Sequence, residues 1–152
     1  MKVPHKIQIE VPSDLNALDT VLYKFNQIDY NFISERDWLE CRLALAEGFT
    51  NAVRHAHKHL SKDIPVKIEI FIAEPKIEIR ICDFGAAFNL EEFVARKTKR
   101  TNAWLASGRG IPILLKVADR LTYFRTEQEQ NCLSIVKNLT KSVDVCQSSS
   151  KI

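Results

Sequence analysis

The most informative segment of this 152-residue chain is residues 43–55, LALAEGFTNAVRH. Its apolar residues recur every three or four positions, which predicts an amphipathic helix. We expect the buried stripe of this helix to contain Leu39, Ala46, Phe49, Val53, Ala56 and Leu60. Glu47 and Asn51 are one turn apart on the other side of the helix, with the small Ala44 beside them. A carboxylate and a carboxamide in this arrangement can act as a general base and as an oxygen ligand of Mg²⁺. In isolation, such a pair is more typical of a solvated polar face.

A second motif, Asp83-Phe84-Gly85, ends a predicted strand. A carboxylate at this place can accept a hydrogen bond from the exocyclic amine of adenine, and the glycine would let the backbone pass close to the base. The alternative interpretation is a simple turn that closes the strand.

A third motif consists of Gly108, Arg109 and Gly110, which precede an apolar helical segment. Backbone N–H groups at the start of a helix can bind phosphate, and an arginine can add a charge-assisted contact. The basic run at residues 96–100 could close over a triphosphate as a lid. Taken singly, a helix-entry turn and a solvated loop are the commoner interpretations of these two features.

The rest of the chain supplies the framework for these motifs. Alternating apolar residues predict strands at residues 7–11, 66–72, 77–81, 121–124 and 133–136. Ser34, with Asp37 three residues later, resembles a capping box that opens the long helix, which we expect to run to about His59. The order β-α-α-β-β-loop-α-β-β predicts an α/β fold, a two-layer α/β sandwich with a mixed, mainly antiparallel sheet and helices on one face.

Composition limits the class of protein. With 45% hydrophobic and 27% charged residues the chain is an ordinary globular one, and we expect a single domain at residues 1–140 and a flexible tail at residues 141–152. No apolar stretch approaches the roughly 18 residues that a membrane span needs. The net charge of +3 is too small to indicate a nucleic-acid partner. The four cysteines are scattered without C-x-x-C spacing, so we expect reduced thiols and a cytoplasmic protein.

The three motifs in this order resemble those of the GHKL (Bergerat-fold) ATP-binding superfamily, which has the histidine-kinase-like ATPase fold. The similarity covers nearly the whole chain and is strongest to the anti-sigma factor serine/threonine kinases of bacterial partner-switching systems. The most specific piece is residues 47–55, EGFTNAVRH, because those kinases carry a similar E-x-x-T-N-A-x-x-H.

This resemblance implies ATP and Mg²⁺ as cofactors and a role for each motif. Glu47 would be the catalytic base that accepts the proton of an attacking serine or threonine hydroxyl. Asn51 would hold the Mg²⁺ that bridges the phosphates. Asp83 would bind the adenine amine, with Gly85 beside the base. His55 matches a histidine often present in these kinases, but no role is assigned to it.

Gly108, Arg109 and Gly110 would form the phosphate side of the site by the same resemblance. Two positions depart from the pattern of the superfamily. Ala87 stands where the adenine motif usually has a second glycine, and Pro112 stands where an aliphatic residue usually follows the phosphate motif. Of the properties that the resemblance implies, these departures therefore affect closure of the lid most, and with it kinase activity.

The implied function is an ATP-dependent protein serine/threonine kinase that acts as an anti-sigma regulatory factor. Its expected partners are a STAS-type antagonist protein, which it phosphorylates, and a sigma factor or similar target, which it sequesters. A homodimer is a further expectation, and direct contact with nucleic acid or membrane is not expected. Two alternatives stay open: a non-catalytic nucleotide-binding interaction module, and a stand-alone ATP-binding part of a two-component system. A metal site at His55, His57 and His59 is disfavoured because the sequence offers no third ligand at suitable spacing.

Overall fold

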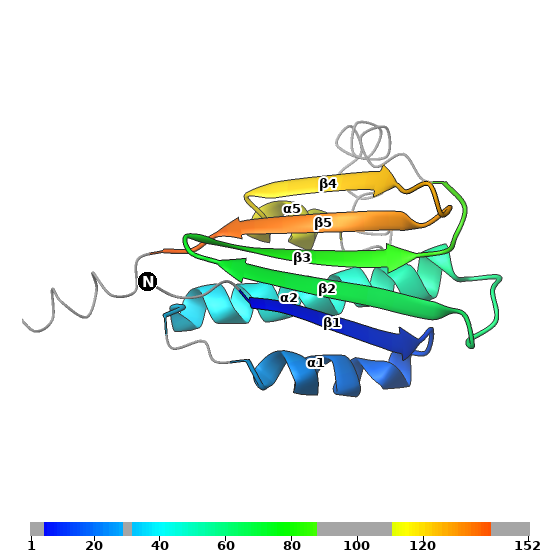
Figure 1. The fold of residues 1–152 in the computed structure, drawn as a ribbon, viewed down its shortest axis with the longest axis horizontal. Coiled ribbons are helices and arrows are strands. Elements are labelled where there is room, and N and C mark those ends of the chain that lie inside the picture. Colours follow the sequence, from blue (N-terminus) through cyan, green and yellow to red (C-terminus); the bar gives the residue numbers. More distant parts are fainter. Residues whose placement is uncertain (1–4, 29–31, 88–110, 141–152) are drawn as a thin grey trace, which may run out of the picture.

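The computed structural model describes residues 5–28, 32–87 and 111–140 (Figure 1). Within these residues the strands are β1 (His5–Pro12), β2 (Pro65–Ala73), β3 (Lys76–Asp83), β4 (Arg120–Arg125) and β5 (Asn131–Asn138). The helical elements are the 3-10 turn η1 (Leu15–Ala17), the helices α1 (Leu18–Asn26), α2 (Glu35–Asn51) and α5 (Ile111–Val117), and the π-helical turn η2 (Ala52–Ala56). The predicted tail at residues 141–152 and the basic run at residues 96–100 lie outside the described residues.

The five strands form one sheet in the order β1-β2-β3-β5-β4. Neighbouring strands are antiparallel at every described pairing. Ile9 of β1 lies opposite Ile68 of β2, which lies opposite Ile81 of β3, so one face of the sheet carries rows of apolar side chains. The predicted α/β sandwich is confirmed, and the sheet that we expected to be mainly antiparallel is antiparallel throughout these pairings.

The helices α1, α2 and α5 lie on one side of the sheet and cover this apolar face (Figure 1). Phe25 of α1, Leu45 and Phe49 of α2, and Leu114 of α5 are completely buried against the sheet. Burial of a side chain of this size contributes roughly 1.5–3 kcal/mol. The two layers therefore share one hydrophobic core.

The buried face of the long helix agrees with the predicted stripe at Phe49 and differs from it at both leucines. Leu39 is 52% exposed and Leu60 is 37% exposed, whereas Ala44 is 1% exposed. A Cβ atom on Gly48 would lie 2.2 Å from the Cδ1 atom of Ile81, so this glycine lets the helix lie directly on β3. Small residues such as Ala44 and Gly48, together with Leu45 and Phe49, mark the face of α2 that contacts the sheet.

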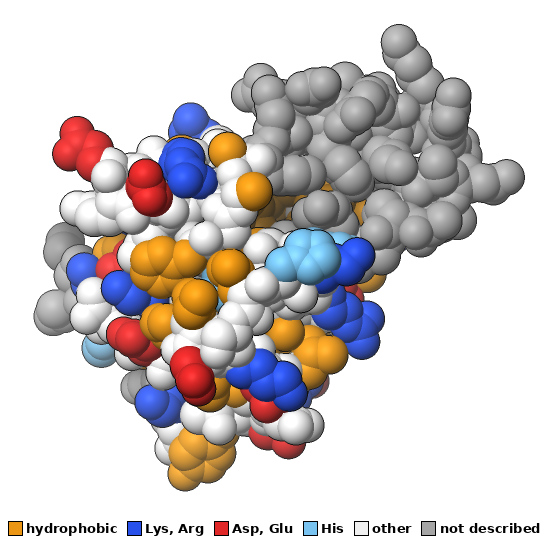
Figure 2. Space-filling model, turned by 90° about the vertical axis from the view of Figure 1, so that its right-hand side faces the viewer, with side chains coloured by type: hydrophobic (Ala, Val, Ile, Leu, Met, Phe, Trp, Pro, Cys, Tyr) orange, Lys and Arg blue, Asp and Glu red, His pale blue; other side chains and the backbone are white. Residues whose placement is uncertain are grey.

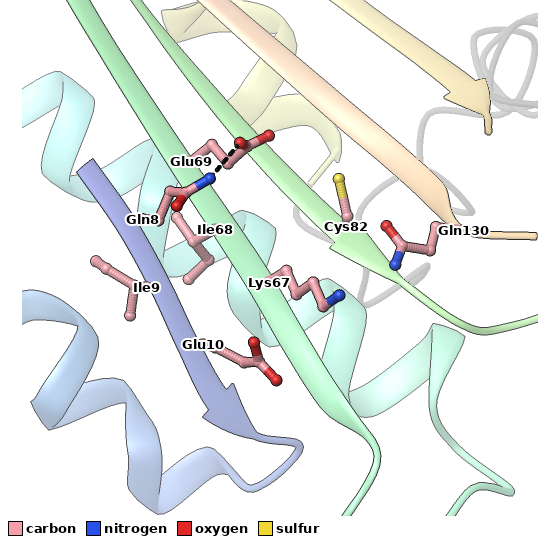
Figure 3. Close-up of a pocket in the computed structure, with 8 residues that line it drawn as sticks. All are labelled: Gln8, Ile9, Glu10, Lys67, Ile68, Glu69, Cys82 and Gln130. Carbon is pink, nitrogen blue, oxygen red and sulfur yellow. Dashed lines mark hydrogen bonds between the residues drawn. The ribbon is translucent and has the colours of Figure 1, made fainter. Parts of the chain in front are cut away.

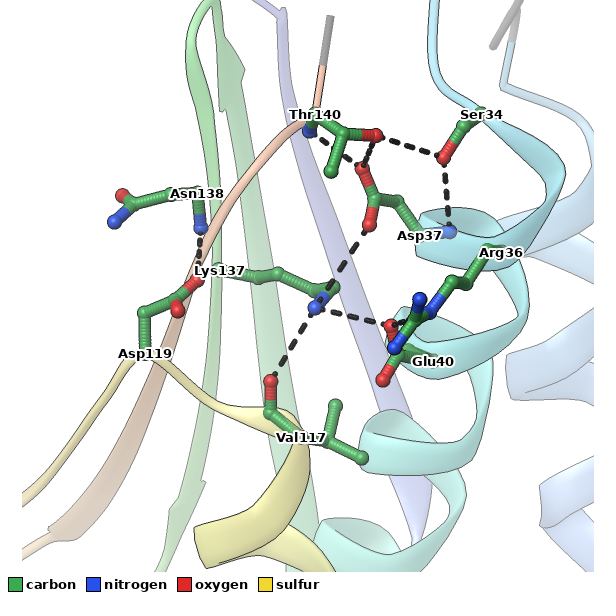
Figure 4. Close-up of polar contacts among 9 residues, drawn as sticks. All are labelled: Ser34, Arg36, Asp37, Glu40, Val117, Asp119, Lys137, Asn138 and Thr140. Carbon is green, nitrogen blue, oxygen red and sulfur yellow. Dashed lines mark hydrogen bonds and ion pairs between the residues drawn. The ribbon is translucent and has the colours of Figure 1, made fainter. Parts of the chain in front are cut away.

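A cluster of polar side chains joins the start of α2 to the end of β5 (Figure 4). The Ser34 hydroxyl caps the helix by accepting the N–H of Asp37 at 3.1 Å, as predicted. The Asp37 carboxylate accepts the N–H of Thr140 at 2.7 Å and its hydroxyl at 2.8 Å. The Lys137 ammonium lies 3.8 Å from Asp37 and 3.2 Å from Glu40. These hydrogen bonds and ion pairs connect two regions that are about 100 residues apart in the sequence.

The expectation of reduced thiols is wrong for two of the four cysteines. Cys82 and Cys132 lie opposite each other on β3 and β5 and form a disulfide. Their pairing was not predictable from spacing, because it depends on the register of two strands that are separated by residues 84–130 in the chain. Cys41 is free and buried in the core. Within the described ranges, no helix is long and apolar enough to cross a membrane.

Candidate functional site

A cavity of about 330 Å³ lies where the turn after β3 meets the end of α2 and the π-helical turn η2. Figure 2 shows this end of the molecule, where histidine and hydrophobic side chains lie next to each other. The lining residues are Asn51, His55, Ala56, His59, Leu60, Phe84, Gly85, Ala86, Ala87 and Tyr123. Residues from the first two predicted motifs therefore meet at one cavity.

Asp83, the last residue of β3, lies directly behind this lining and is 3% exposed. Its Oδ1 atom accepts hydrogen bonds from the N–H of Gly85 at 2.9 Å and from Nδ2 of Asn131 at 3.0 Å. The hydroxyl of Tyr123, a residue that lines the cavity, lies 3.5 Å from Oδ2. Because 3.5 Å is long for a hydrogen bond of a hydroxyl, Oδ2 keeps capacity to accept one from a ligand.

Asn131, the first residue of β5, fixes the turn that follows β3. Its Nδ2 atom donates to the carbonyls of Gly85 at 2.9 Å and Ala86 at 3.1 Å, in addition to Asp83. Its Oδ1 atom accepts from the Arg125 guanidinium at 2.9 Å. One buried carboxamide therefore holds both the carboxylate and the backbone of the glycine turn in place.

Gly85 packs against the π-helical turn. A Cβ atom at this position would lie 2.3 Å from the carbonyl oxygen of Ala56, so only glycine fits without a backbone shift. The hydrogen bond from the N–H of His57 to the carbonyl of Ala52, five residues earlier, defines this π-helical turn. Single π-helical turns inside α-helices are frequent at functional sites, because they redirect the side chains that follow them.

Asn51 ends α2 immediately before this turn and lines the cavity. It is 6% exposed, and its Oδ1 atom has no hydrogen-bond partner within the described part of the chain. A buried carbonyl oxygen without a partner costs roughly 1–3 kcal/mol, which a bound cation or donor would recover. The oxygen is a suitable ligand for Mg²⁺, so the donor present at this position fits the metal that the resemblance implies.

His57 follows the π-helical turn and is 3% exposed. Its Nε2 atom accepts the N–H of Phe84 at 2.8 Å, which positions the residue between Asp83 and Gly85. Burial lowers the pKa of His57, although the negative charge of Asp83 and a backbone contact with Ile64 oppose this effect. The Ile64 contact is weak, because Nδ1 makes no hydrogen bond of good geometry to the described residues. The lowered pKa keeps His57 neutral, as its acceptor role requires.

The remaining predicted residues fall into two groups. Glu47 is half-buried on α2, one turn before Asn51, and does not line the cavity. Gly108, Arg109 and Gly110 lie outside the described residues. Among the side chains that the structure describes, His, Cys, Asp and Glu residues do not gather in groups of three or more that could hold a metal ion.

Sequence reasoning missed three residues of this site: His57, Tyr123 and Asn131. Each reaches the site through a long-range contact, with sequence separations of 27, 40 and 48 residues to its partner. His57 follows the first motif closely in the sequence, but its position between His55 and His59 suggested only a metal site. The other two depend on the register of β4 and β5, for which the sequence carries no local signal.

A two-layer sandwich with a cavity between a helix-borne asparagine and a strand-end aspartate defines the class of nucleotide-binding domains found in GHKL proteins. The chain belongs to the histidine kinase-like ATPase domain family, whose sequence profile matches residues 11–137.

Several curated relatives carry the name serine-protein kinase RsbW. The protein from Listeria monocytogenes serovar 1/2a is 38% identical over 52 residues, which cover 34% of this chain and 32% of that protein. The match thus spans about a third of the length of the Listeria relative. The protein from Staphylococcus aureus strain RF122 is 24% identical over 125 residues, which cover 78% of this chain and 79% of that protein.

A solved structure has the same fold. The crystal structure of the RsbU and RsbW domains of Rv1364c from Mycobacterium tuberculosis matches this chain with a TM-score of 0.63 and 12% sequence identity. The match covers 89% of this chain and 32% of that chain. At this identity the likeness concerns the fold alone.

Proposed function

We propose that the chain is a cytoplasmic, ATP-dependent protein serine/threonine kinase that acts as an anti-sigma regulatory factor. It phosphorylates a STAS-type antagonist and sequesters a sigma factor or a similar target. Membership of the histidine kinase-like ATPase family and the similarity to RsbW kinases support this proposal. The observation that carries it is the buried Oδ1 atom of Asn51, which has no hydrogen-bond partner among the described residues and lies at the same cavity as Gly85.

In this proposal the cavity holds the nucleoside end of ATP. The Oδ2 atom of Asp83 accepts a hydrogen bond from the exocyclic amine of adenine, and the turn at Gly85, which lines the cavity, lies beside the base. Asn51 supplies an oxygen ligand for Mg²⁺, which neutralises phosphate charge when it is bound. Gly108 and Gly110 contact the phosphates through backbone N–H groups, and Arg109 adds a positive charge.

Glu47 is the general base of the proposed reaction. It accepts the proton of the serine or threonine hydroxyl of the antagonist as that oxygen attacks the γ-phosphate. Its place one helical turn before Asn51 puts the carboxylate beside the proposed Mg²⁺ ligand rather than inside the cavity. Phosphoryl transfer depends mainly on positioning and charge neutralisation, so a base, a metal ligand and donors to the phosphates suffice for it.

The test is phosphate transfer by Glu47→Gln. Radiolabelled ATP, Mg²⁺ and purified STAS-domain proteins encoded near the gene are incubated with wild type and with the variant. Removal of a general base lowers transfer by roughly 10²-fold or more, while ATP binding stays within a factor of about two. Glu35→Gln is the matched control, since Glu35 is exposed in the first turn of the same helix and keeps wild-type transfer. Equal transfer by wild type and Glu47→Gln would exclude Glu47 as the base.

A second candidate function is a nucleotide-binding interaction module that transfers no phosphate. The observation that favours it is the absence of Glu47 from the described lining of the cavity. ATP binding by wild type, together with no phosphoprotein from any STAS-domain partner, is the result that selects this function over the kinase.

A further inference from the structure

The outer face of the sheet, opposite the helices, carries the disulfide. Among the described elements none lies over this face (Figure 1). Lys67 of β2 lies opposite Cys82 of β3, Cys82 opposite Cys132 of β5, and Cys132 opposite Phe124 of β4. These four residues form one row across the sheet. The disulfide is the covalent link in the middle of this row.

Cys82 also borders a hollow on this face (Figure 3). The hollow has a volume of about 520 Å³, and polar side chains such as Gln8, Lys67 and Gln130 line it together with Cys82. Cys82 is 6% exposed and borders the hollow, which gives a small reductant a route to its sulfur atom, whereas Cys132 is 3% exposed and does not line the hollow. Cys41, in contrast, lies in the core, where burial raises the pKa of its thiol to about 12 and makes it unreactive.

The disulfide is adjacent in the chain to the two residues that hold the glycine turn. Asp83 follows Cys82, and Asn131 precedes Cys132. Asp83 and Asn131 are themselves partners in the ladder and are joined by the 3.0 Å hydrogen bond described above. Their side chains point to the helix side of the sheet, while the cysteines lie on the outer side, because successive residues of a strand alternate between faces. The S–S bond therefore holds the end of β3 and the start of β5 together directly behind the cavity.

We propose that Cys82–Cys132 is a thiol-exchange site for a dithiol reductant, and that its cleavage lowers the affinity of the cavity for ATP. The second part rests on the proposed function. With the S–S bond intact, the carboxylate of Asp83 and the carboxamide of Asn131 are held in binding geometry before the nucleotide arrives. After cleavage, part of the binding free energy is spent on ordering these two strand ends.

The dithiol reductant supplies the two electrons that cleavage of the disulfide requires. A thiolate of the dithiol attacks Sγ of Cys82, the Cys82–Cys132 bond breaks, and the electron pair passes to the sulfur of Cys132, which takes up a proton. The second thiolate of the reductant then attacks the mixed disulfide and releases the sulfur of Cys82, which takes up the second proton. The protein gains two electrons and two protons, and the dithiol is oxidised to a disulfide.

The test uses the full chain with Cys146→Ser, so that Cys82 and Cys132 are the reactive pair and Cys41 is the internal buried control. The folded protein is treated with dithiothreitol and then with N-ethylmaleimide, and labelled peptides are mapped by mass spectrometry. We expect labels on Cys82 and Cys132 only after reduction.

ATP affinity is measured by calorimetry in both states, with circular dichroism as the check of folding. We expect the reduced protein to bind ATP about fivefold or more weakly, within the usual range of coupling between sites.

A second variant separates loss of the bond from the action of the reductant. The double substitution Cys82→Val and Cys132→Val replaces the disulfide by a pair of side chains that suits neighbouring strands. We expect it to bind ATP as weakly as the reduced protein and not to respond to dithiothreitol.

Three results would overturn the inference: no labelling of Cys82 and Cys132 in the folded protein after reduction, loss of the fold on reduction, or equal ATP affinity in the two redox states. Equal binding in both states leaves the proposed function intact. Absence of ATP binding in both states contradicts the proposed function and, with it, the effect on affinity.

Discussion

At the scale of single residues, the two oxygens of the Asp83 carboxylate have different tasks. Oδ1 is used within the protein, by Gly85 and Asn131, whereas among the described residues the contact of Oδ2 is the long one with Tyr123. This division predicts that a substitution can remove the ligand-binding oxygen without disturbing the turn. The carboxamide of asparagine has the required shape, with one acceptor oxygen and one donor nitrogen.

Asp83→Asn is therefore expected to weaken ATP binding while the protein stays folded. The carboxamide oxygen can keep the bonds from Gly85 and Asn131, while its Nδ2 donor then faces the amine of adenine. Hydrogen bonds to charged groups contribute roughly 1.5–3 kcal/mol, so we expect the affinity to fall about 10- to 100-fold. Calorimetry with ATP and Mg²⁺ measures this, and Asp63→Asn, at an exposed loop position, is the control that keeps wild-type affinity. Unchanged affinity of Asp83→Asn would remove Asp83 from the proposed site.

At the scale of secondary-structure elements, the change from α2 to η2 decides how the site is built. The π-helical turn places the carbonyl of Ala56 against Gly85, so that the helix and the strand end meet without side chains between them. Asn51 lies just before the turn and His57 just after it, and both contribute to the region around the cavity. The close contact makes the position of Gly85 sensitive to a single added methyl group.

Gly85→Ala tests this contact. The added carbon would lie 2.3 Å from a backbone oxygen, so the turn or the helix must move. Overpacking of this kind costs roughly 1–3 kcal/mol. We expect urea unfolding to show a loss of stability in this range, together with weaker ATP binding. Ala87→Ser adds an atom at an exposed position of the same lining and serves as the control, with stability within about 0.5 kcal/mol of wild type. A Gly85→Ala variant as stable as this control would show that the contact is not tight.

The sequence was sufficient to predict those elements whose signals are local. Alternating isoleucines identified β2 and β3, and Ser34 identified the start of α2. The buried face of α2 was predicted in part: Phe49 is buried as expected, but Leu39 is exposed, and small residues such as Gly48 that fit against β3 were not included. The π-helical turn has no local signature, and it ends the regular helix at Asn51, before the predicted end at His59.

At the scale of the whole molecule, contacts between distant strands complete both the site and the fold. The pairing of β3 with β5 brings Asn131 to Asp83 and Cys132 to Cys82. Asp37 fastens the far end of β5 to α2 through Thr140 and Lys137. Long-range register of this kind is set by the packing of the complete sheet, so it could not be predicted from the sequence of either strand.

The Asp37 cluster predicts a pH dependence of stability. Burial alone would raise the pKa of Asp37, but hydrogen bonds from Thr140 and the charge of Lys137 outweigh it and lower the pKa below its usual value. A carboxyl group with a lowered pKa in the folded state stabilises the protein above the unfolded pKa of about 3.9, and this contribution is lost as the pH falls through the lower folded value.

We therefore expect Asp37→Asn to lower the free energy of unfolding by roughly 1–3 kcal/mol at pH 7, and the difference from wild type to shrink below about pH 3.9. Urea unfolding at pH 7 and at pH 3 measures both quantities. Asp19→Asn, at an exposed position of α1, is the control with stability close to wild type at both values. A difference that does not shrink between pH 7 and pH 3 would show that the charge of Asp37 is not its cause.

The end of α2 and the turn after β3 together form the proposed site for ATP with Mg²⁺. Titration of ¹⁵N-labelled protein with ATP and Mg²⁺, followed by NMR, tests it most directly. We predict saturable shifts of the Gly85 backbone N–H and of the side-chain NH₂ groups of Asn51 and Asn131, all with one dissociation constant. Shifts confined to other parts of the chain, or no shifts at millimolar ATP, would contradict the account.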